Sequence, residues 1–177
     1  MSWLPRTVFL PCLLLVACGL GSKSQLTSPY LLATWMENKV NGEIRLTWDD
    51  RGQVLLEAVF TPDRGCHLYG KDIPPAGVDG LGRPTLLEIS PDSLIMPAGE
   101  LIASEPAILD EEIPGLLIYP VGRVTLTLPI ILPEGKGWFD DLVAVTYMAC
   151  KNGTCYPPVE GKIIPVSVPG LEELKGK

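Results

Sequence analysis

Short runs of alternating apolar and polar residues, separated by turn residues, make up most of the chain beyond residue 35. In residues 123–132 the aliphatic side chains at positions 124, 126, 128 and 130 fall on one face of an extended chain, and the threonines at 125 and 127 fall on the other. A period of two is typical of a half-buried strand. The same pattern predicts seven strands, over residues 43–48, 53–61, 66–69, 85–90, 123–132, 142–149 and 162–168.

Residues that favour tight turns separate these runs. Asp-Asp-Arg-Gly at 49–52 and Pro-Asp-Arg-Gly at 62–65 each end in a glycine that can adopt positive φ, and each contains an aspartate that can bond back to the chain. Glycine and proline together make up 36 of 177 residues, well above the usual share of roughly 12%. This composition argues against a helical bundle, and seven short strands favour an all-β protein built as a two-sheet antiparallel sandwich.

The N-terminal segment differs from the rest of the chain. Residues 1–17 have one early cation, Arg6, and a short apolar stretch, which is typical of a secretory signal peptide and too short to span a bilayer. The segment ends in Leu-Val-Ala-Cys, which resembles the lipobox of bacterial lipoproteins and implies lipidation of Cys18 at the mature N-terminus. Ordinary cleavage near this point, with Cys18 incidental, is the alternative.

Residues after the signal set the expected domain limits. Gly, Ser, Lys, Gln and Thr dominate residues 19–29, so we assign residues 18–34 to a flexible tether. The folded domain is expected over residues 35–168, with a C-terminal tail at 169–177 that forms at most one helical turn. An exported domain of this kind lies in an oxidising compartment, on the periplasmic side of a bacterial membrane.

The charge of the chain excludes one class of partner. There are 21 Asp and Glu against 14 Lys and Arg, giving a formal charge of −7. Binding of nucleic acid calls for a basic face, so we expect no nucleic-acid partner.

The candidate chemistry is concentrated at residues 147–158. Asn152-Gly153 is a strong signal for a tight hairpin turn, so Cys150 and Cys155 are expected to face one another at a separation that a disulfide can bridge. Two interpretations remain open from the spacing. A structural bridge closing about six residues would contribute roughly 2 kcal/mol in the chain-entropy model. A reversible dithiol is equally compatible with the spacing. A shift of 30 mV in reduction potential corresponds to only about 1.4 kcal/mol, so a little strain in the hairpin would be enough to make the disulfide exchangeable.

The sequence resembles the N-terminal periplasmic domain of the thiol:disulfide interchange protein DsbD. The resemblance is carried by Val145-Thr146-Tyr147 before Cys150 and by Cys155-Tyr156-Pro157-Pro158, with support from Gly-Cys-His-Leu-Tyr at 65–69 and from Ile-Tyr at 118–119. It covers about residues 40–168. It implies an immunoglobulin-like sandwich in which Cys150 and Cys155 are the redox pair, with Cys155 forming the mixed disulfide.

The resemblance also implies an acidic pair in a loop that covers the disulfide. Counting back from Tyr119, which the resemblance places among the residues that cap or flank the site, these positions fall on Asp110 and Glu111, followed by Glu112. Carboxylates beside a thiol can accept or return its proton, whereas a solvated acidic loop is the plainer interpretation. The aromatic residue that completes the family's cover is absent here, and Ile113 is the apolar residue that could replace it. The hairpin is also one residue shorter than in the family.

Two tyrosines and a third cysteine invite other interpretations. Tyr147 and Tyr156 flank the cysteine hairpin, where they could shield it or simply pack in strands. Cys66 is expected to be a small buried hydrophobe, facing away from its neighbour His67 if both lie in a strand. Cys66 and the cysteine pair, with Met148, are soft ligands that would suit Cu(I) only if they converged.

The sequence therefore predicts a membrane-tethered thiol:disulfide oxidoreductase of the protein-disulfide reductase type. The resemblance implies that it exchanges electrons with thioredoxin-like periplasmic proteins and with a separate transmembrane electron donor, and that it needs no bound cofactor or metal. The alternative is a non-enzymatic lipoprotein, an interaction or assembly module with a structural disulfide. Copper handling is a third possibility.

Overall fold

The structure is a computed structural model that describes residues 28–175. It contains fourteen strands and one short helix in this part of the chain. The strands are β1 Tyr30–Glu37, β2 Val40–Trp48, β3 Val54–Pro62, β4 His67–Leu68, β5 Leu86–Ile89, β6 Met96–Pro97, β7 Ile102–Ala103, β8 Ile108–Leu109, β9 Leu117–Ile118, β10 Val124–Ile131, β11 Trp138–Tyr147, β12 Ala149–Lys151, β13 Thr154–Cys155 and β14 Val159–Pro169, and the helix is α1 Leu171–Lys175.

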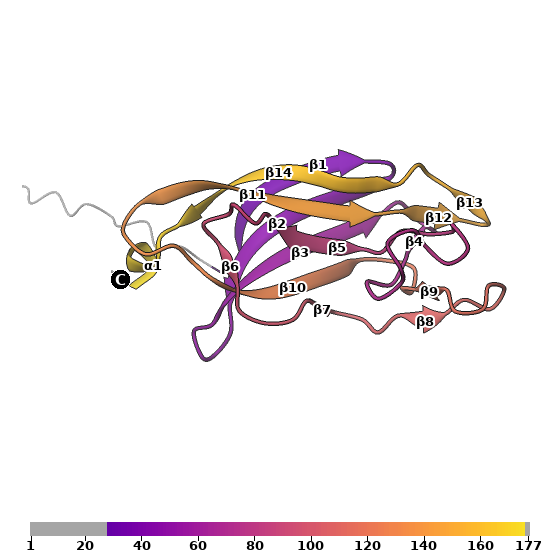
Figure 1. The fold of residues 1–177 in the computed structure, drawn as a ribbon, viewed down its shortest axis with the longest axis horizontal. Coiled ribbons are helices and arrows are strands. Elements are labelled where there is room, and N and C mark those ends of the chain that lie inside the picture. Colours follow the sequence, from indigo (N-terminus) through magenta and orange to yellow (C-terminus); the bar gives the residue numbers. More distant parts are fainter. Residues whose placement is uncertain (1–27, 176–177) are drawn as a thin grey trace, which may run out of the picture.

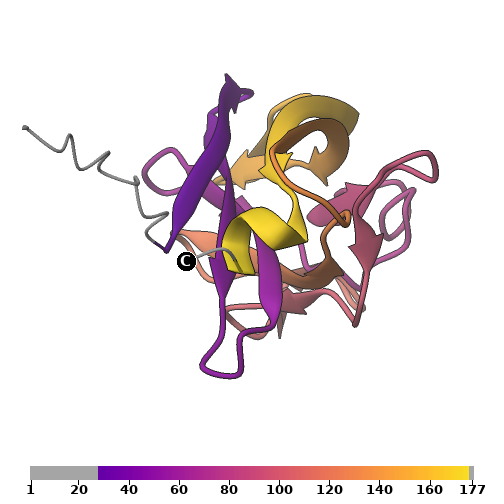
Figure 2. The same ribbon diagram turned by 90° about the vertical axis from the view of Figure 1, so that its left-hand side faces the viewer.

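Two layers of antiparallel strands form a sandwich (Figures 1 and 2). One sheet has the order β1-β2-β3-β10-β6, with β7 also paired to β10, and the facing sheet has the order β14-β11-β5. A small third sheet, β13-β12-β4, continues from the facing sheet, and β8 pairs with β9 in a separate ribbon. The all-β, immunoglobulin-like antiparallel sandwich predicted from the sequence is confirmed, as are all seven predicted strands.

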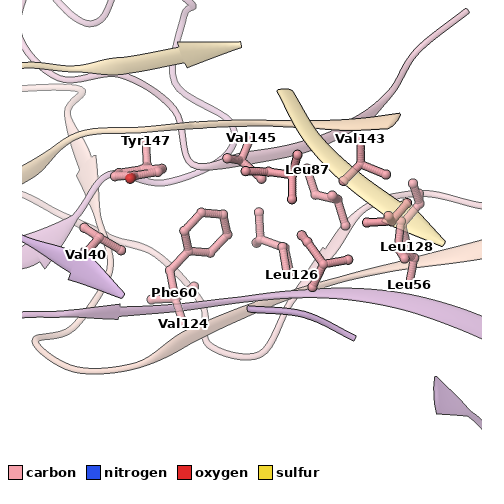
Figure 3. Close-up of a cluster of buried hydrophobic side chains, with 14 of the residues drawn as sticks. Val40, Leu56, Phe60, Leu87, Val124, Leu126, Leu128, Val143, Val145 and Tyr147 are labelled. Carbon is pink, nitrogen blue, oxygen red and sulfur yellow. The ribbon is translucent and has the colours of Figure 1, made fainter. Parts of the chain in front are cut away.

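The core lies between the two layers and consists of the inward side chains of each strand (Figure 3). Phe60 and Leu126 from one sheet meet Leu87, Val143 and Val145 from the other, and all five are almost fully buried. The period of two along β10 is fulfilled, because its burial alternates at each residue from Val124 to Ile130. Burial of this apolar surface is the main favourable contribution to folding.

The structure corrects the N-terminal limit of the domain. Residues 30–34, assigned to the tether, belong to β1, which pairs with β2. The strand was missed because a register shift between Leu31 and Ala33 breaks its alternation, and because it lies at the edge of its sheet. Tyr30 and Trp35 nevertheless pack against the core. The predicted signal peptide, the lipidation site at Cys18 and the tether up to residue 27 lie outside the described residues.

The C-terminal segment is tied to the domain rather than free of it. The amides of Gly170 and Leu171 donate to carbonyls of the loop before β11, and Leu174 of α1 packs against the core. Figure 2 shows α1 lying across one end of the sandwich. Within residues 28–175, no helix has the length and apolarity needed to cross a membrane.

Truncation of a core side chain should separate packing from surface effects. Leu126 is 0% exposed at the centre of β10, and Ile131 at the end of the same strand is 48% exposed. We expect Leu126→Ala to lower the free energy of unfolding by about 2–5 kcal/mol, and Ile131→Ala to change it by about 0.5 kcal/mol or less. Urea denaturation with the disulfide intact measures both, and equal effects would contradict this placement of the core.

Candidate functional site

The two cysteines face each other across a tight hairpin at one end of the sandwich. Asn152 and Gly153 both have positive φ, 49° and 73°, which is the backbone of a type I′ turn. Cys150 in β12 and Cys155 in β13 are direct partners in the ladder, and a disulfide joins them. The hairpin and the facing pair predicted from Asn-Gly are confirmed.

The two sulfur-bearing residues differ sharply in exposure. Cys150 lies in the middle strand of the β13-β12-β4 sheet and is 1% exposed, whereas Cys155 lies in the outer strand and is exposed. A nucleophile from solvent therefore reaches Cys155 and not Cys150. In such an attack the sulfur of Cys150 becomes the leaving group inside the protein.

A buried phenol lies against both sulfur atoms. The Tyr69 hydroxyl oxygen is 2.8 Å from Sγ of Cys150 and 3.4 Å from Sγ of Cys155. A disulfide sulfur carries no hydrogen, so in the oxidised state the phenol is the donor. Burial raises the pKa of Tyr69, and the negative charge of Asp110 raises it further. The hydroxyl therefore keeps its proton and remains a donor to the sulfurs.

Close packing fixes the position of the Tyr69 ring. Gly82 has φ of +79°, and a Cβ at that position would lie only 2.8 Å from the ring. On the same segment of chain the Thr85 hydroxyl donates to the Tyr69 carbonyl at 2.7 Å. The ring of His67 meets the Tyr69 ring edge to face, with centroids 5.5 Å apart. Contacts to both the backbone and the ring of Tyr69 therefore fix the position of its hydroxyl group.

His67 is the cross-strand neighbour of Cys150 in β4. Because Cys150 also pairs with Cys155, these three residues form one row across the small sheet, with side chains on the same face. Burial lowers the pKa of His67, and the charge of Asp110 opposes that shift. The imidazole is therefore mainly neutral near pH 7 and does not place a full positive charge beside Cys150.

An apolar cluster separate from the main core surrounds Cys150. Its buried members are Tyr69, Ile73, Leu116 and Cys150. Ile113 and Met148 are among the partly buried residues packed against it. Ile113 therefore lies where an apolar cover for this cluster would be placed.

The three carboxylates of the acidic loop between β8 and β9 differ in burial. Asp110 is half-buried, and its Oδ1 accepts the amides of Glu112 and Ile113, both at 2.9 Å. Its own amide donates to the Leu116 carbonyl, which closes the loop. The Glu111 and Glu112 side chains are exposed. Asp110 is thus the acid whose charge acts on Tyr69 and His67.

The three tyrosines singled out from the sequence lie elsewhere. Tyr119 and Tyr147 are fully buried in the main core, and Tyr156 packs partly buried against it. The Tyr147 hydroxyl accepts from Trp35 Nε1 and donates to the Glu37 carbonyl, both at 3.1 Å. Burial raises its pKa to about 12. None of the three belongs to the cluster around Cys150.

Tyr69 and His67 are the site residues that sequence reasoning did not assign. Both stood in the predicted strand at 66–69, at alternate positions and so on one face. The sequence did not reveal the register of β4 with β12, and this register places His67 and Tyr69 beside the sulfurs. Cys66 faces the other way and is buried as a free thiol in the main core.

The soft ligands considered for copper are divided between two clusters. Cys66 lies in the main core, whereas Cys150 and Met148 belong to the second cluster. Across residues 28–175, no group of three or more His, Cys, Asp or Glu side chains is placed to hold a metal ion. The contacts of the site therefore bear directly on the chemistry of the disulfide.

Comparison with known proteins adds a likeness of structure. No model of a known family matches the chain, and no curated protein matches its sequence. Among solved structures, the chain is similar to the reduced form of the N-terminal domain of Neisseria meningitidis DsbD. The TM-score is 0.42 and the identity 15%, over 80% of this chain and 86% of that chain.

The difference in exposure predicts the order of alkylation after reduction. With limiting iodoacetamide in native buffer, we expect modification of Cys155 first, because this residue is exposed, and of the buried Cys150 more slowly. Cys66, buried in the main core, should react only on unfolding. Peptide mass spectrometry over time gives the order, and equal rates for Cys150 and Cys155 would contradict the burial asymmetry.

Removal of the phenol oxygen should slow opening of the disulfide. Tyr69→Phe keeps the ring but removes the donor at 2.8 Å from Cys150, which would stabilise the departing thiolate. Hydrogen bonds to charged groups contribute about 1.5–3 kcal/mol, so we expect the rate constant for reduction by dithiothreitol to fall about tenfold or more. Tyr119→Phe, which removes a hydroxyl bonded to the Lys71 amide, is the matched control and should leave the rate nearly unchanged.

Proposed function

We propose that this protein is an exported, membrane-tethered thiol:disulfide interchange domain that relays electrons through Cys150 and Cys155. The observation that carries the proposal is the asymmetric burial of the pair, because Cys155 is exposed whereas Cys150 is buried with its sulfur against a protonated phenol. A bridge that served only to hold two strands together would need neither feature. The sequence resemblance described above supports the same activity.

The exchange step follows from which sulfur is accessible. A thiolate of a partner dithiol attacks Sγ of Cys155, the bond to Sγ of Cys150 breaks, and Cys150 leaves as a thiolate. The second thiolate of the partner then attacks the partner sulfur that is bonded to Cys155. The partner's own disulfide forms, and Cys155 leaves as a thiolate. Two electrons and two protons have then passed to this domain, and the partner is oxidised. The reverse sequence transfers them to an oxidised partner.

Tyr69 and Asp110 would manage charge and protons during this step. The Tyr69 hydroxyl is placed to donate to the Cys150 sulfur while it acquires negative charge. Asp110, whose charge acts on Tyr69 and His67, is the candidate for accepting and returning the proton. Glu111 and Glu112, exposed on the same loop, would act only through their field. Ile113 would cover the Cys150 cluster from that loop.

The partners and the location form the finer part of the proposal. Thioredoxin-like periplasmic proteins would form the mixed disulfide with Cys155, and a separate transmembrane protein would supply electrons. Cys18 would carry the lipid that anchors the domain on the periplasmic side of a bacterial membrane. No bound cofactor is needed, because both electrons are carried by the two sulfurs.

A structural bridge in a non-enzymatic lipoprotein is the competing function. It is favoured by the position of the disulfide next to a type I′ turn, where it holds together a very short pair of strands. Such a bridge would have a low potential, and its loss would loosen the fold around it.

The reduction potential of the pair separates the two functions. Equilibration of the domain in glutathione or dithiothreitol buffers, followed by alkylation and mass spectrometry, should give a value of about −270 to −120 mV. Circular dichroism should show the same fold in both states. A value below about −300 mV, or unfolding on reduction, would favour the structural bridge.

Single-cysteine variants complete this test. Cys150→Ser should accumulate a mixed disulfide with a thioredoxin-like protein through Cys155, and Cys155→Ser should abolish exchange. Cys66→Ala, which alters a thiol in the main core, should exchange at the rate of the unmodified protein. Exchange that survives loss of Cys155 would overturn the proposal.

A further inference from the structure

The chain between β4 and β5 leaves Tyr69 and returns to it. At the start of this segment the Gly70 amide donates to the Leu117 carbonyl at 2.8 Å, and at its end Pro84 forms a parallel bridge with Tyr69. Between these points, residues 78–81 form a tight hairpin turn, closed by two backbone hydrogen bonds of 2.9 Å. Figure 1 shows β4 and β5 meeting at the end of the sandwich that carries β12 and β13. The segment therefore lies beside the phenol at the cysteine end.

This hairpin turn buries little apolar surface. Asp79 and Gly80 at its centre are exposed, and Leu81 is 46% exposed. Val78 is partly buried and packs against the cluster around Cys150. Because burial of apolar surface is small here, the position of the turn depends strongly on its polar contacts.

Arg83 supplies these polar contacts. Its Nη1 donates to the carbonyl of Gly82 at 2.7 Å and to that of Ala76 at 3.1 Å, which joins the chain before the turn to the chain after it. Its Nε donates to the carboxylate of Glu160. A guanidinium group is planar and its donors have fixed directions, so one side chain holds both carbonyls and the carboxylate in a defined geometry.

Glu160 connects this contact to the main scaffold. It lies near the start of β14, where the register with β11 shifts between the pairs made by Val145 and Tyr147. The ladder continues on both sides of this shift and fixes the course of β14. Arg83 therefore fastens residues 76–82 to a strand whose position is set by the core.

Gly82 transmits this contact to the phenol. Its carbonyl accepts from Arg83, and a Cβ at its position would lie only 2.8 Å from the Tyr69 ring. If Gly82 moved back, the ring would be free to tilt, and its hydroxyl would leave the position 2.8 Å from Sγ of Cys150. Within residues 28–175, the hydrogen bonds of the Arg83 side chain reach neither Tyr69 nor a sulfur. An effect of Arg83 on the disulfide therefore passes through Tyr69.

We propose that Arg83 is a positioning residue for thiol–disulfide exchange, because it holds Gly82 against the Tyr69 ring and so keeps the phenol hydroxyl at the sulfur of Cys150. When the disulfide opens, Cys150 takes the electron pair and becomes a thiolate. A donor that is already in place stabilises this charge without rearrangement. The inference rests on the proposed function and adds the residue that fixes its hydrogen-bond donor.

A double-mutant cycle on the rate of reduction by dithiothreitol tests this role. Arg83→Met keeps an apolar stem and removes the guanidinium group. We expect it to slow reduction about three- to tenfold when Tyr69 is present, the effect of one hydrogen bond. In the Tyr69→Phe background, which has no hydroxyl to position, it should change the rate by less than about twofold. Arg51→Met removes the same group from an exposed position in the turn between β2 and β3, and as the matched control it should leave the rate unchanged.

The cycle separates positioning from general support of the fold. Equal effects of Arg83→Met in the two backgrounds would show a merely structural role and overturn the proposal, as would an unchanged rate when Tyr69 is present. Arg83→Lys keeps the charge beside Glu160 but lacks the planar fork, so we expect it to slow reduction about threefold. A full rate in Arg83→Lys would overturn the proposal too, because charge alone would then suffice. If Arg83→Met does not fold, the same cycle with Arg83→Lys decides by the same criteria.

Carbon-13 NMR of tyrosine-labelled protein gives an independent readout. The Cζ signal of Tyr69, identified by its loss in Tyr69→Phe, reports on the hydrogen bond of the hydroxyl in the oxidised protein. It should shift in Arg83→Met and stay in place in Arg51→Met, and an unmoved signal in Arg83→Met would contradict the proposal. Failure of the proposed function would instead appear as absence of exchange with thioredoxin-like proteins, since neither dithiothreitol reduction nor NMR requires a partner protein.

Discussion

The antiparallel pairing of β11 with β14 is the interaction on which the rest of the site depends. The ladder runs from the Trp138–Pro169 pair to the Tyr147–Val159 pair, and one face of both strands is buried in the core. Beyond it the same two segments of chain continue as β12 and β13, which are too short to be stable by themselves. The core therefore fixes the direction in which the tip leaves the sandwich. The position of the two cysteines is therefore set by the pairing of β11 with β14.

Two structural supports act on the tip from the other side. β4 pairs with β12 and places Tyr69 and His67 on the face that carries the sulfurs. The loop between β8 and β9 adds Asp110 and the apolar side chain of Ile113. Three segments distant in sequence thus surround Cys150, while Cys155 stays at an edge. The two cysteines therefore differ chemically because Cys150 is buried and Cys155 is exposed to solvent.

Much of this arrangement could be predicted from local sequence signals, and the remainder could not for identifiable reasons. The seven main strands follow from a period of two, and the facing cysteines follow from Asn152-Gly153, because both signals act over a few residues. β1 was missed because a bulge breaks its alternation. The role of Tyr69 depends on the register between β4 and β12, which is a non-local property set by the whole sandwich. Tyr147 was placed near the site by proximity along the chain and Tyr119 by the family resemblance, whereas burial assigns both to the main core.

Loop length and core size together bear on whether the bridge is structural. Closing about six residues removes little entropy from the unfolded chain, roughly 2 kcal/mol, because the ends of so short a loop are already close together. The main core is formed by side chains from both sheets, while Cys150 belongs to the smaller cluster at the tip. Opening the bridge therefore leaves most of the buried apolar surface untouched, and the Asn152-Gly153 turn still favours the hairpin. A disulfide that adds so little to folding can be opened and closed without loss of the fold, which is the physical condition that a relay of electrons must meet.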